Sequence, residues 1–291
     1  TKTMIERTEE RFGLKPQRGR ISLAPHREHW NGLSVDGCVS RSVIDTALWL
    51  DVTSGGSEEP GAPPPPSRPF VESVRKPPGK LRIAYSTLAP RAAAPPTVSD
   101  VVKGAVAETA ELLRSLGHET AQHDPEWGMI GNNSVPRYLR GVAEDVANVP
   151  HPERLERRTR GFGRLGRLIP DKVFEQARRA AESDAARVNA IFDSHDVLMT
   201  PVMGGTALPV RRWEGRSALY TVLGMSRFYP YCIPWNHLGN PSMSIPFGFG
   251  ADGMPLAIQI IGRKESEPLL FSLAAQIEAE RPWADRRPPI S

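Results

Sequence analysis

Residues 81–124 contain three successive stretches that decide the fold class: LRIAYST (81–87), TVSDVVKGAVAETAELLRSLG (97–117) and HETAQHD (118–124). The first is short and apolar, as a buried strand is. The second has a capping residue at Thr97 or Ser99 and ends at Gly117, which predicts a helix. The third is the next candidate strand. This order predicts a βαβ unit and an α/β protein.

The same alternation extends outward from this unit in both directions. Upstream, SRSVIDTALWLDV (40–52) has helical spacing and a cap at Ser40 or Ser42. Downstream, a long polar helical region ends in the apolar run DVLMTPVM (196–203), which suits a strand buried on both faces. The remaining expected elements are a helix over 217–232, strands over 241–248 and 254–262, and a closing helix over 267–280. We therefore expect a layered α/β architecture with the sheet covered on both faces.

A proline-rich stretch, about 54–79, interrupts this pattern. It carries eight prolines between Pro60 and Pro78 and few core-forming residues. The stretch resembles a proline ligand for SH3-type domains, but a semi-rigid connector over the surface is the favoured interpretation.

Composition limits the class of protein. The 291 residues are 39% hydrophobic, and 37 Lys plus Arg against 33 Asp plus Glu give a formal net charge of +4. Collagen, coiled coil and wholesale disorder are excluded. Two cysteines, Cys38 and Cys232, make no disulfide framework, and the charged residues 1–11 contain no apolar run. We expect a cytoplasmic protein without membrane association.

Two clusters could carry other functions. RLERRTRGFGRLGR (154–167) holds six arginines, but Glu153 and Glu156 accompany it and no aromatic series follows, so a solvated face is favoured over nucleic-acid binding. His26 and His29 lie in a loop without further ligands nearby, so we expect no metal site. The dinucleotide, phosphate-loop and serine-elbow motifs are absent.

Two stretches resemble the amidase signature family. FGLKPQRGRISLAPHREHWNGLSVDG (12–37), with CVSRSVIDTALWLD after it, is similar to the family's Gly-Leu-Lys-Pro strand and the helix that follows. PWNHLGNPSMSIPFGFGADGMPLAIQIIG (234–262) resembles its C-terminal core, and LLFSLAAQIEAERPW (269–283) its closing helix. Gln17 stands where the family usually has Thr, and Cys38 where it usually has Pro.

The resemblance implies a fold and an activity. It implies a partial amidase-signature fold, with a mixed β-sheet core under helices, in which residues 12–291 form the C-terminal portion of a single domain and residues 1–11 do not match. It also implies hydrolysis of carboxamides, without a cofactor, through an acyl-enzyme formed on a serine. In the family a second serine, in a cis peptide, and a buried lysine activate that nucleophile.

This catalytic set is not found in the sequence. In the family it precedes the Gly-Leu-Lys-Pro strand, and the residues before Gly13 here, TKTMIERTEERF, include neither serine nor glycine. Thr1 falls at or beside the nucleophile position and is a remote substitute. Lys15 matches the strand lysine of the family, not its catalytic one. We therefore assign no catalytic residue.

The resemblance also places part of a pocket in the C-terminal half. Tyr231, Trp235 and Asn236 precede the turn Gly239-Asn240-Pro241, where the family shapes the pocket for the acyl group. A purely structural turn with buried aromatic residues is the alternative.

Two hypotheses for function follow. The chain is an amidase-family protein that is inactive alone, with a small-molecule amide as its partner when an N-terminal half completes it. Alternatively, it is a non-catalytic or split subunit that complements such a half, assembles with copies of itself or joins an amidotransferase-like complex. Neither hypothesis involves nucleic acid or a membrane.

Overall fold

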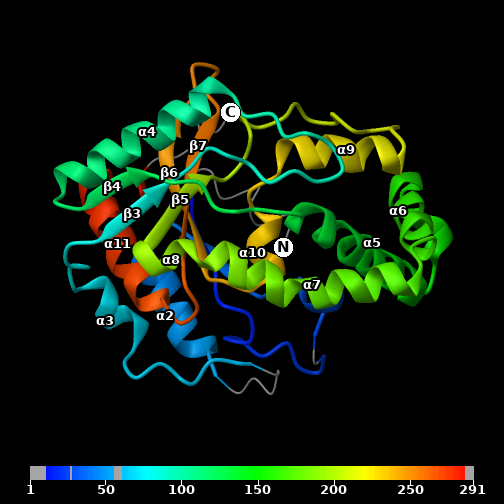
Figure 1. Cartoon of the computed structure of the whole chain (residues 1–291), viewed down its shortest axis with the longest axis horizontal. Coiled ribbons are helices and arrows are strands. Elements are labelled where there is room, and N and C mark those ends of the chain that lie inside the picture. The colour runs from blue at the N-terminus through cyan, green and yellow to red at the C-terminus, as the bar shows by residue number, and fades with distance from the viewer. Residues whose placement is uncertain (1–10, 27, 56–60, 286–291) are drawn as a thin grey trace.

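A mixed seven-stranded sheet forms the centre of the molecule (Figure 1). The computed structural model describes residues 11–26, 28–55 and 61–285. The strand order is β2-β1-β6-β7-β5-β3-β4, so neighbouring strands come from distant parts of the sequence.

The βαβ unit predicted from residues 81–124 is confirmed. Strand β3 (Arg82–Tyr85) leads into helix α4 (Asp100–Ser115) and then into strand β4 (Glu119–Gln122). Strands β3 and β4 pair in parallel, with Ile83 opposite Thr120. The helix is preceded by Ser99 at the N-cap position and followed by Gly117 at φ 95°, a conformation that favours glycine.

The middle of the sheet combines both strand orientations. Strand β5 (Val197–Pro201) is buried along its whole length, pairs in parallel with β3 and pairs antiparallel with β7 (Pro255–Gly262). Strand β6 (Ser242–Phe249) joins β7 to β1 (Phe12–Lys15), and β1 pairs with β2 (Cys38–Ser40), all antiparallel. The mixed sheet expected from the resemblance is confirmed.

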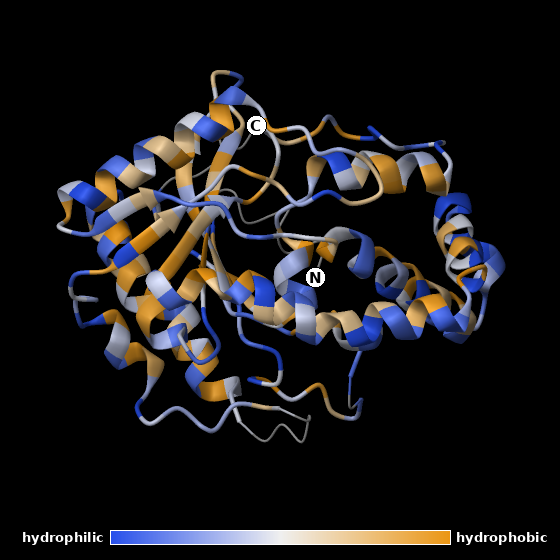
Figure 2. Cartoon of the chain, in the orientation of Figure 1, coloured by the Kyte–Doolittle hydropathy of each residue, from blue (hydrophilic) through white to orange (hydrophobic). Residues whose placement is uncertain are grey.

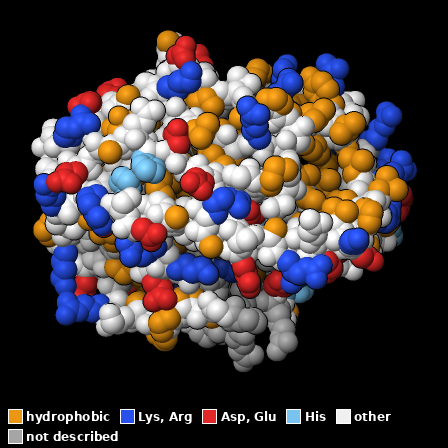
Figure 3. Space-filling view, viewed as in Figure 1, with side chains coloured by type: hydrophobic (Ala, Val, Ile, Leu, Met, Phe, Trp, Pro, Cys, Tyr) orange, Lys and Arg blue, Asp and Glu red, His pale blue; other side chains and the backbone are white. Residues whose placement is uncertain are grey.

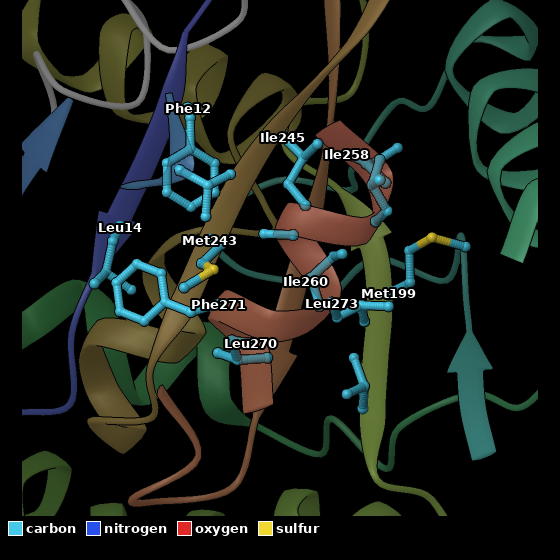
Figure 4. Packing of buried hydrophobic residues seen from close by; sticks show 14 of the residues in the cluster. Phe12, Leu14, Met199, Met243, Ile245, Ile258, Ile260, Leu270, Phe271 and Leu273 are labelled. Carbon is cyan, nitrogen blue, oxygen red and sulfur yellow. The ribbon is translucent and has the colours of Figure 1, made fainter. Parts of the chain in front are cut away.

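One face of the sheet is covered by helices α2 (Val43–Thr53), α3 (Phe70–Val74), α4 and α11 (Glu267–Glu280). Figure 4 shows Leu270, Phe271 and Leu273 of α11 among side chains of β1, β5, β6 and β7. The strand residues that contribute to this face, such as Leu14, Met243 and Ile260, are almost completely buried. Their burial is the main stabilising contribution of this layer.

The opposite face is covered by helices α5 (Ile130–Asn148), α7 (Asp171–Asn189), α8 (Ile191–Ser194) and α10 (Ile233–Leu238). A second cluster joins Leu198 and Ile261 of the sheet to Trp235 of α10 and Trp127. Helices therefore cover both faces, as expected. Figure 2 shows the central strands as mostly hydrophobic and the helices as striped along their length.

A helical region projects from the sheet on this second side (Figure 1). It contains the far ends of α5 and α7, the 3-10 helix η2 (Pro152–Arg154), α6 (Arg157–Arg167) and α9 (Ala218–Phe228). Helix α6 packs tightly on α5 at Gly166, where a β-carbon would collide with the carbonyl of Leu139. A separate apolar cluster that includes Val146, Phe162 and Val222 holds these helices together.

The connector prediction for residues 54–79 is wrong in one respect. Residues 70–74 form the short helix α3, and the side chain of Phe70 is fully buried against Phe271 of α11, with 5.7 Å between ring centroids. Asp51 of α2 accepts hydrogen bonds from the backbone N–H groups of Phe70 and Val71. The end of this segment is therefore part of the core, because one aromatic side chain anchors it.

None of the helices in the described ranges is both long and apolar enough to cross a membrane.

Candidate functional site

A cavity of about 540 Å³ lies between the loop 23–37 and helices α5, α9 and α10. Its walls come from the loop 23–37, the segment around Pro90, and helices α5, α9 and α10. The loop includes the 3-10 helix η1 (Trp30–Gly32), which packs on α5. Figure 3 shows hydrophobic side chains gathered on the side of the molecule that carries α9 and α6. A cavity of this size can hold a small organic molecule.

The three pocket residues inferred from the resemblance lie at different depths. Asn236 lines the cavity, with 9% of its surface exposed. Tyr231 and Trp235 are fully buried and are not part of the lining. The Tyr231 hydroxyl donates to the carbonyl of Thr87 at 2.6 Å, and Trp235 packs against Trp127. The structure thus brings Asn236 to the cavity and places the two aromatic residues behind it. Thr1 lies outside the described residues.

The turn that carries Asn236 is fixed by contacts with a distant arginine. Helix α10 ends at Gly239, whose φ of 83° is left-handed and therefore suits glycine. The Arg18 guanidinium donates to the carbonyl oxygens of Asn236 and His237 at 2.5 and 2.9 Å. The next residue of the turn, Asn240, is fully buried, and its amide donates to the carbonyl of Gly262 at 2.9 Å. The main chain beside the cavity is thus held on two sides.

Behind the turn, a buried polar network links α5, α7 and α10. His237 Nε2 lies 3.1 Å from Asp184 Oδ2, and His237 Nδ1 lies 2.9 Å from Arg137 Nη1. A guanidinium can only donate, so Nδ1 of the ring accepts and Nε2 carries the proton given to Asp184. Asp184 also accepts hydrogen bonds from Asn133 and Arg187. All its partners are donors, as a buried carboxylate requires.

Burial controls the charge of this network. Burial, followed by the charge of Arg137, lowers the pKa of His237 to about 4. The ring is therefore neutral near pH 7, which agrees with its role as acceptor from Arg137. Burial also lowers the pKa of Arg137 to about 10, well above neutral pH. A neutral ring between two charged groups positions α10 and is not a proton carrier at neutral pH.

A row of polar side chains crosses the same face of the sheet. Thr200, Gln259 and Ser244 stand opposite one another on β5, β7 and β6, so their side chains share one face. Gln259 donates to Ser242 at 2.6 Å. Ser244 Oγ is buried and has no hydrogen-bond partner among the described residues. This row is the polar counterpart of the apolar face under α11.

Lys15 continues that row on β1. Its ammonium group is buried and donates to the carbonyl oxygens of Pro16 and Asn240 at 3.0 and 2.5 Å. Burial, and then the charge of Arg18, lowers the pKa of Lys15 to about 7. The resemblance matches Lys15 to a strand lysine of the family. The structure places it in β1, and its carbonyl contacts tie β1 to the Asn240 turn.

The histidine pair 26 and 29 and the arginines of 154–167 were the two other clusters noted in the sequence. His26 and His29 stack with 5.8 Å between ring centroids, and the described residues contain no group of three His, Cys, Asp or Glu side chains that could hold a metal ion. Six arginines of 154–167 lie in η2 and α6, where Arg158 pairs with Glu156 at 3.0 Å. Arg154, Arg157, Arg164 and Arg167 are exposed, whereas Phe162 and Gly166 of the same segment are buried against neighbouring helices.

Comparisons with known proteins give a consistent result. A model of the family described as Amidase matches residues 10–271. The amidase-family protein AmiB2 of Mycobacterium tuberculosis is 41% identical over 281 residues, which cover 96% of this chain and 59% of that protein. The 6-aminohexanoate-cyclic-dimer hydrolase of Paenarthrobacter ureafaciens is 31% identical over 310 residues, 96% of this chain and 60% of that protein. The chain thus spans about three fifths of the length of these curated relatives.

Solved structures share the fold. The structure of 6-aminohexanoate cyclic dimer hydrolase complexed with substrate matches with a TM-score of 0.80 and 26% identity, over 96% of this chain and 62% of that chain. A bacterial aryl acylamidase of the amidase signature family matches with a TM-score of 0.75 and 18% identity, over 96% of this chain and 61% of that chain, which shows a shared fold alone. The family match, the two relatives and the fold agree, and the chain belongs to the amidase signature family.

Proposed function

We propose that this chain supplies the substrate-binding side of an enzyme that hydrolyses carboxamides. The observation that carries the proposal is the cavity of about 540 Å³ beside Asn236, in a chain whose family match covers residues 10–271. In the proposed reaction a serine oxygen attacks the amide carbonyl, forms an ester and releases the amine or ammonia. Water then cleaves the ester to give the carboxylate.

The proposal assigns the serine and lysine chemistry to a segment other than residues 1–291. The sequence before Gly13 holds no serine, and Lys15 donates to two carbonyl groups beside the sheet. The chain would then bind the amide and position it, and the catalytic segment would supply the nucleophile and its base.

The proposal also covers the domain organisation of the chain and its cellular compartment. We infer that residues 12–291 are the C-terminal portion of one domain, because β1 from one end of this range pairs with β6 from the other. Both cysteines are free thiols, which supports a reducing cytoplasm.

Fusion to a catalytic segment tests the proposal. The part of Mycobacterium tuberculosis AmiB2 that this chain does not match would be joined to residues 12–291, and ammonia release from benzamide would be measured. We expect turnover by the fusion, and none when the nucleophilic serine of the added segment is replaced by alanine. A folded fusion without turnover on any simple amide would refute the proposal.

The same segment supplied as a separate chain tests whether this chain complements another one. Recovery of activity when the two chains are expressed together would identify it as half of a split enzyme. Activity only in the covalent fusion would assign it to a single-chain enzyme.

A further inference from the structure

A basic surface lies at the end of the helical region that projects from the sheet (Figure 1). Its first part, residues 153–167, lies in η2, α6 and the turn between them, and holds six arginines and two glutamates. Its second part, residues 210–216, adds three arginines and one glutamate. The two parts together have a formal charge of +6, whereas the whole chain has +4. The positive charge of the chain is therefore concentrated on this basic surface, and the other residues together are net negative.

The two parts of the basic surface are in contact with each other. The guanidinium of Arg158 in α6 donates to the carbonyl of Trp213 at 2.9 Å. A β-carbon at Gly161 would come within 2.9 Å of the β-carbon of Ala218, which directly follows the second part in sequence. Figure 3 shows Lys and Arg side chains beside the hydrophobic side chains on this side of the molecule. Arginines from two distant parts of the sequence thus form one continuous surface.

Most arginines of the basic surface are not neutralised within the chain. Arg158 pairs with Glu156 at 3.0 Å, and Arg211 pairs with Glu214 at 3.2 Å. Five others are exposed, and their guanidinium groups have no hydrogen-bond or ion-pair partner among the described residues: Arg154, Arg157, Arg164, Arg167 and Arg212. Unpaired guanidinium groups that lie close together repel one another and attract an anionic partner, phosphate groups above all.

Three exposed apolar side chains accompany these arginines. Leu168, directly after α6, is 77% exposed, Val210 is 90% exposed, and Leu219 in the first turn of α9 is 59% exposed. Exposed apolar side chains among arginines are typical of a surface that lies on an anionic membrane, where the apolar groups enter the headgroup boundary. The phosphate backbone of nucleic acid would attract the arginines, but it offers these three side chains no apolar environment.

We propose that the basic surface binds anionic lipid membranes, with its arginines at the lipid phosphates and Leu168, Val210 and Leu219 in the headgroup boundary. The inference does not depend on the proposed function, since none of these three residues lines the cavity. The sequence favours a solvated face for residues 154–167, and their arginines are solvated. The structure adds the residues 210–216 and the three apolar side chains to them.

Co-sedimentation with vesicles tests the inference on the wild-type chain. Vesicles of phosphatidylcholine alone would be compared with vesicles of phosphatidylcholine and phosphatidylglycerol in equal parts. We expect the chain to sediment with the anionic vesicles only. The partition coefficient should fall by at least about tenfold when NaCl is raised from about 0.1 M to about 0.5 M, because salt screens exposed charges. Equal binding to both kinds of vesicle, or no binding to the anionic ones, would overturn the proposal.

Two triple variants of equal net charge locate the contact. The first replaces three exposed arginines of α6: Arg157→Glu, Arg164→Glu and Arg167→Glu. The control replaces three exposed basic residues of other segments in the same way: Arg41→Glu, Arg75→Glu and Lys264→Glu. Both lower the formal net charge from +4 to −2. The first should bind no better than to phosphatidylcholine vesicles, and the control should still bind the anionic vesicles. Equal binding by the two variants would show that net charge, and not the basic surface, determines the contact.

A third variant separates lipid from nucleic acid. Leu168→Ser with Val210→Ser leaves the charge unchanged and should weaken partitioning into the anionic vesicles by about tenfold, because it removes apolar area from the headgroup boundary. The same vesicles would be compared with a random DNA duplex at equal phosphate concentration. Unchanged vesicle binding by the double variant, or tighter binding of the wild-type chain to the duplex than to the vesicles, would refute a membrane as the partner.

Discussion

His237 shows how one side chain fixes the wall of the cavity. Its ring accepts from Arg137 of α5 and donates to Asp184 of α7, while its own backbone belongs to α10 and accepts from Arg18. Three helices that are remote in sequence therefore meet at one neutral imidazole. Asn236 precedes this residue directly, so its position in the cavity depends on the network.

The low pKa of His237 predicts how the free energy of unfolding changes with pH. The pKa of His237 is about 4 in the folded chain, against 6.5 for a free histidine side chain. Between pH 4 and pH 6.5 the unfolded chain therefore binds a proton at His237 that the folded chain does not. The free energy of unfolding should therefore decrease as pH falls from 6.5 toward 4, by at most about 1.4 kcal/mol per pH unit. Urea unfolding at several pH values measures this slope.

Substitution of His237 separates its contribution to this pH dependence from that of the other titrating groups. His237→Asn should reduce the slope relative to the wild-type chain, whereas His151→Asn, at an exposed position, should leave it unchanged. If His237→Asn and the wild-type chain have the same slope from pH 6.5 to pH 4, the ring is not held neutral as described.

At the scale of elements, helix α3 anchors the proline-rich connector, residues 54–79, to the core. Phe70 is fully buried between Phe271 and the Arg20 guanidinium, which lies 5.7 Å from its ring centroid. Phe70→Ala should lower the free energy of unfolding by about 3–5 kcal/mol, because it removes a buried ring and leaves a cavity. Urea denaturation of the purified variant measures the loss.

The matched control is a phenylalanine near the surface. Phe249 at the end of β6 is 52% exposed, so Phe249→Ala should cost well under half as much. Similar losses for both variants would show that Phe70 does not anchor the connector.

Local sequence patterns predicted most of the elements. The spacing of apolar residues in α2 and α4, the continuous apolar run of β5 and the signals at helix ends depend on near neighbours in sequence, and these elements formed where expected. The sequence did not predict helix α3, because a single buried side chain, Phe70, within a proline-rich stretch gives no helical periodicity. The alternation Ser242-Met243-Ser244-Ile245 was a readable signal for the polar row on the sheet, since alternate residues face opposite sides.

The candidate site was less predictable. The resemblance pointed to Asn236, which the structure places at the cavity, but Trp30, Tyr138 and Tyr229 come from three separate parts of the chain. Likewise, Arg137 and Asp184 lie on different helices from His237. No periodicity joins residues so far apart, and only the packing of α5 and α7 on the sheet brings them together.

At the scale of the whole molecule, substrate binding and amide chemistry belong to different segments in the proposed enzyme. The cavity, the Asn236 turn and the network behind it all lie within the described residues, and the chain spans about three fifths of the length of its curated relatives. We propose that the catalytic serines and lysine belong to a segment outside residues 1–291.

Amide hydrolysis by purified residues 1–291 tests this division most directly. The chain would be incubated with benzamide at neutral pH, and ammonia would be measured over time beside the active fusion and beside Thr1→Ala. We predict no ammonia above the uncatalysed background from the isolated chain, and turnover from the fusion. Ammonia release by the isolated chain that persists in Thr1→Ala would contradict it.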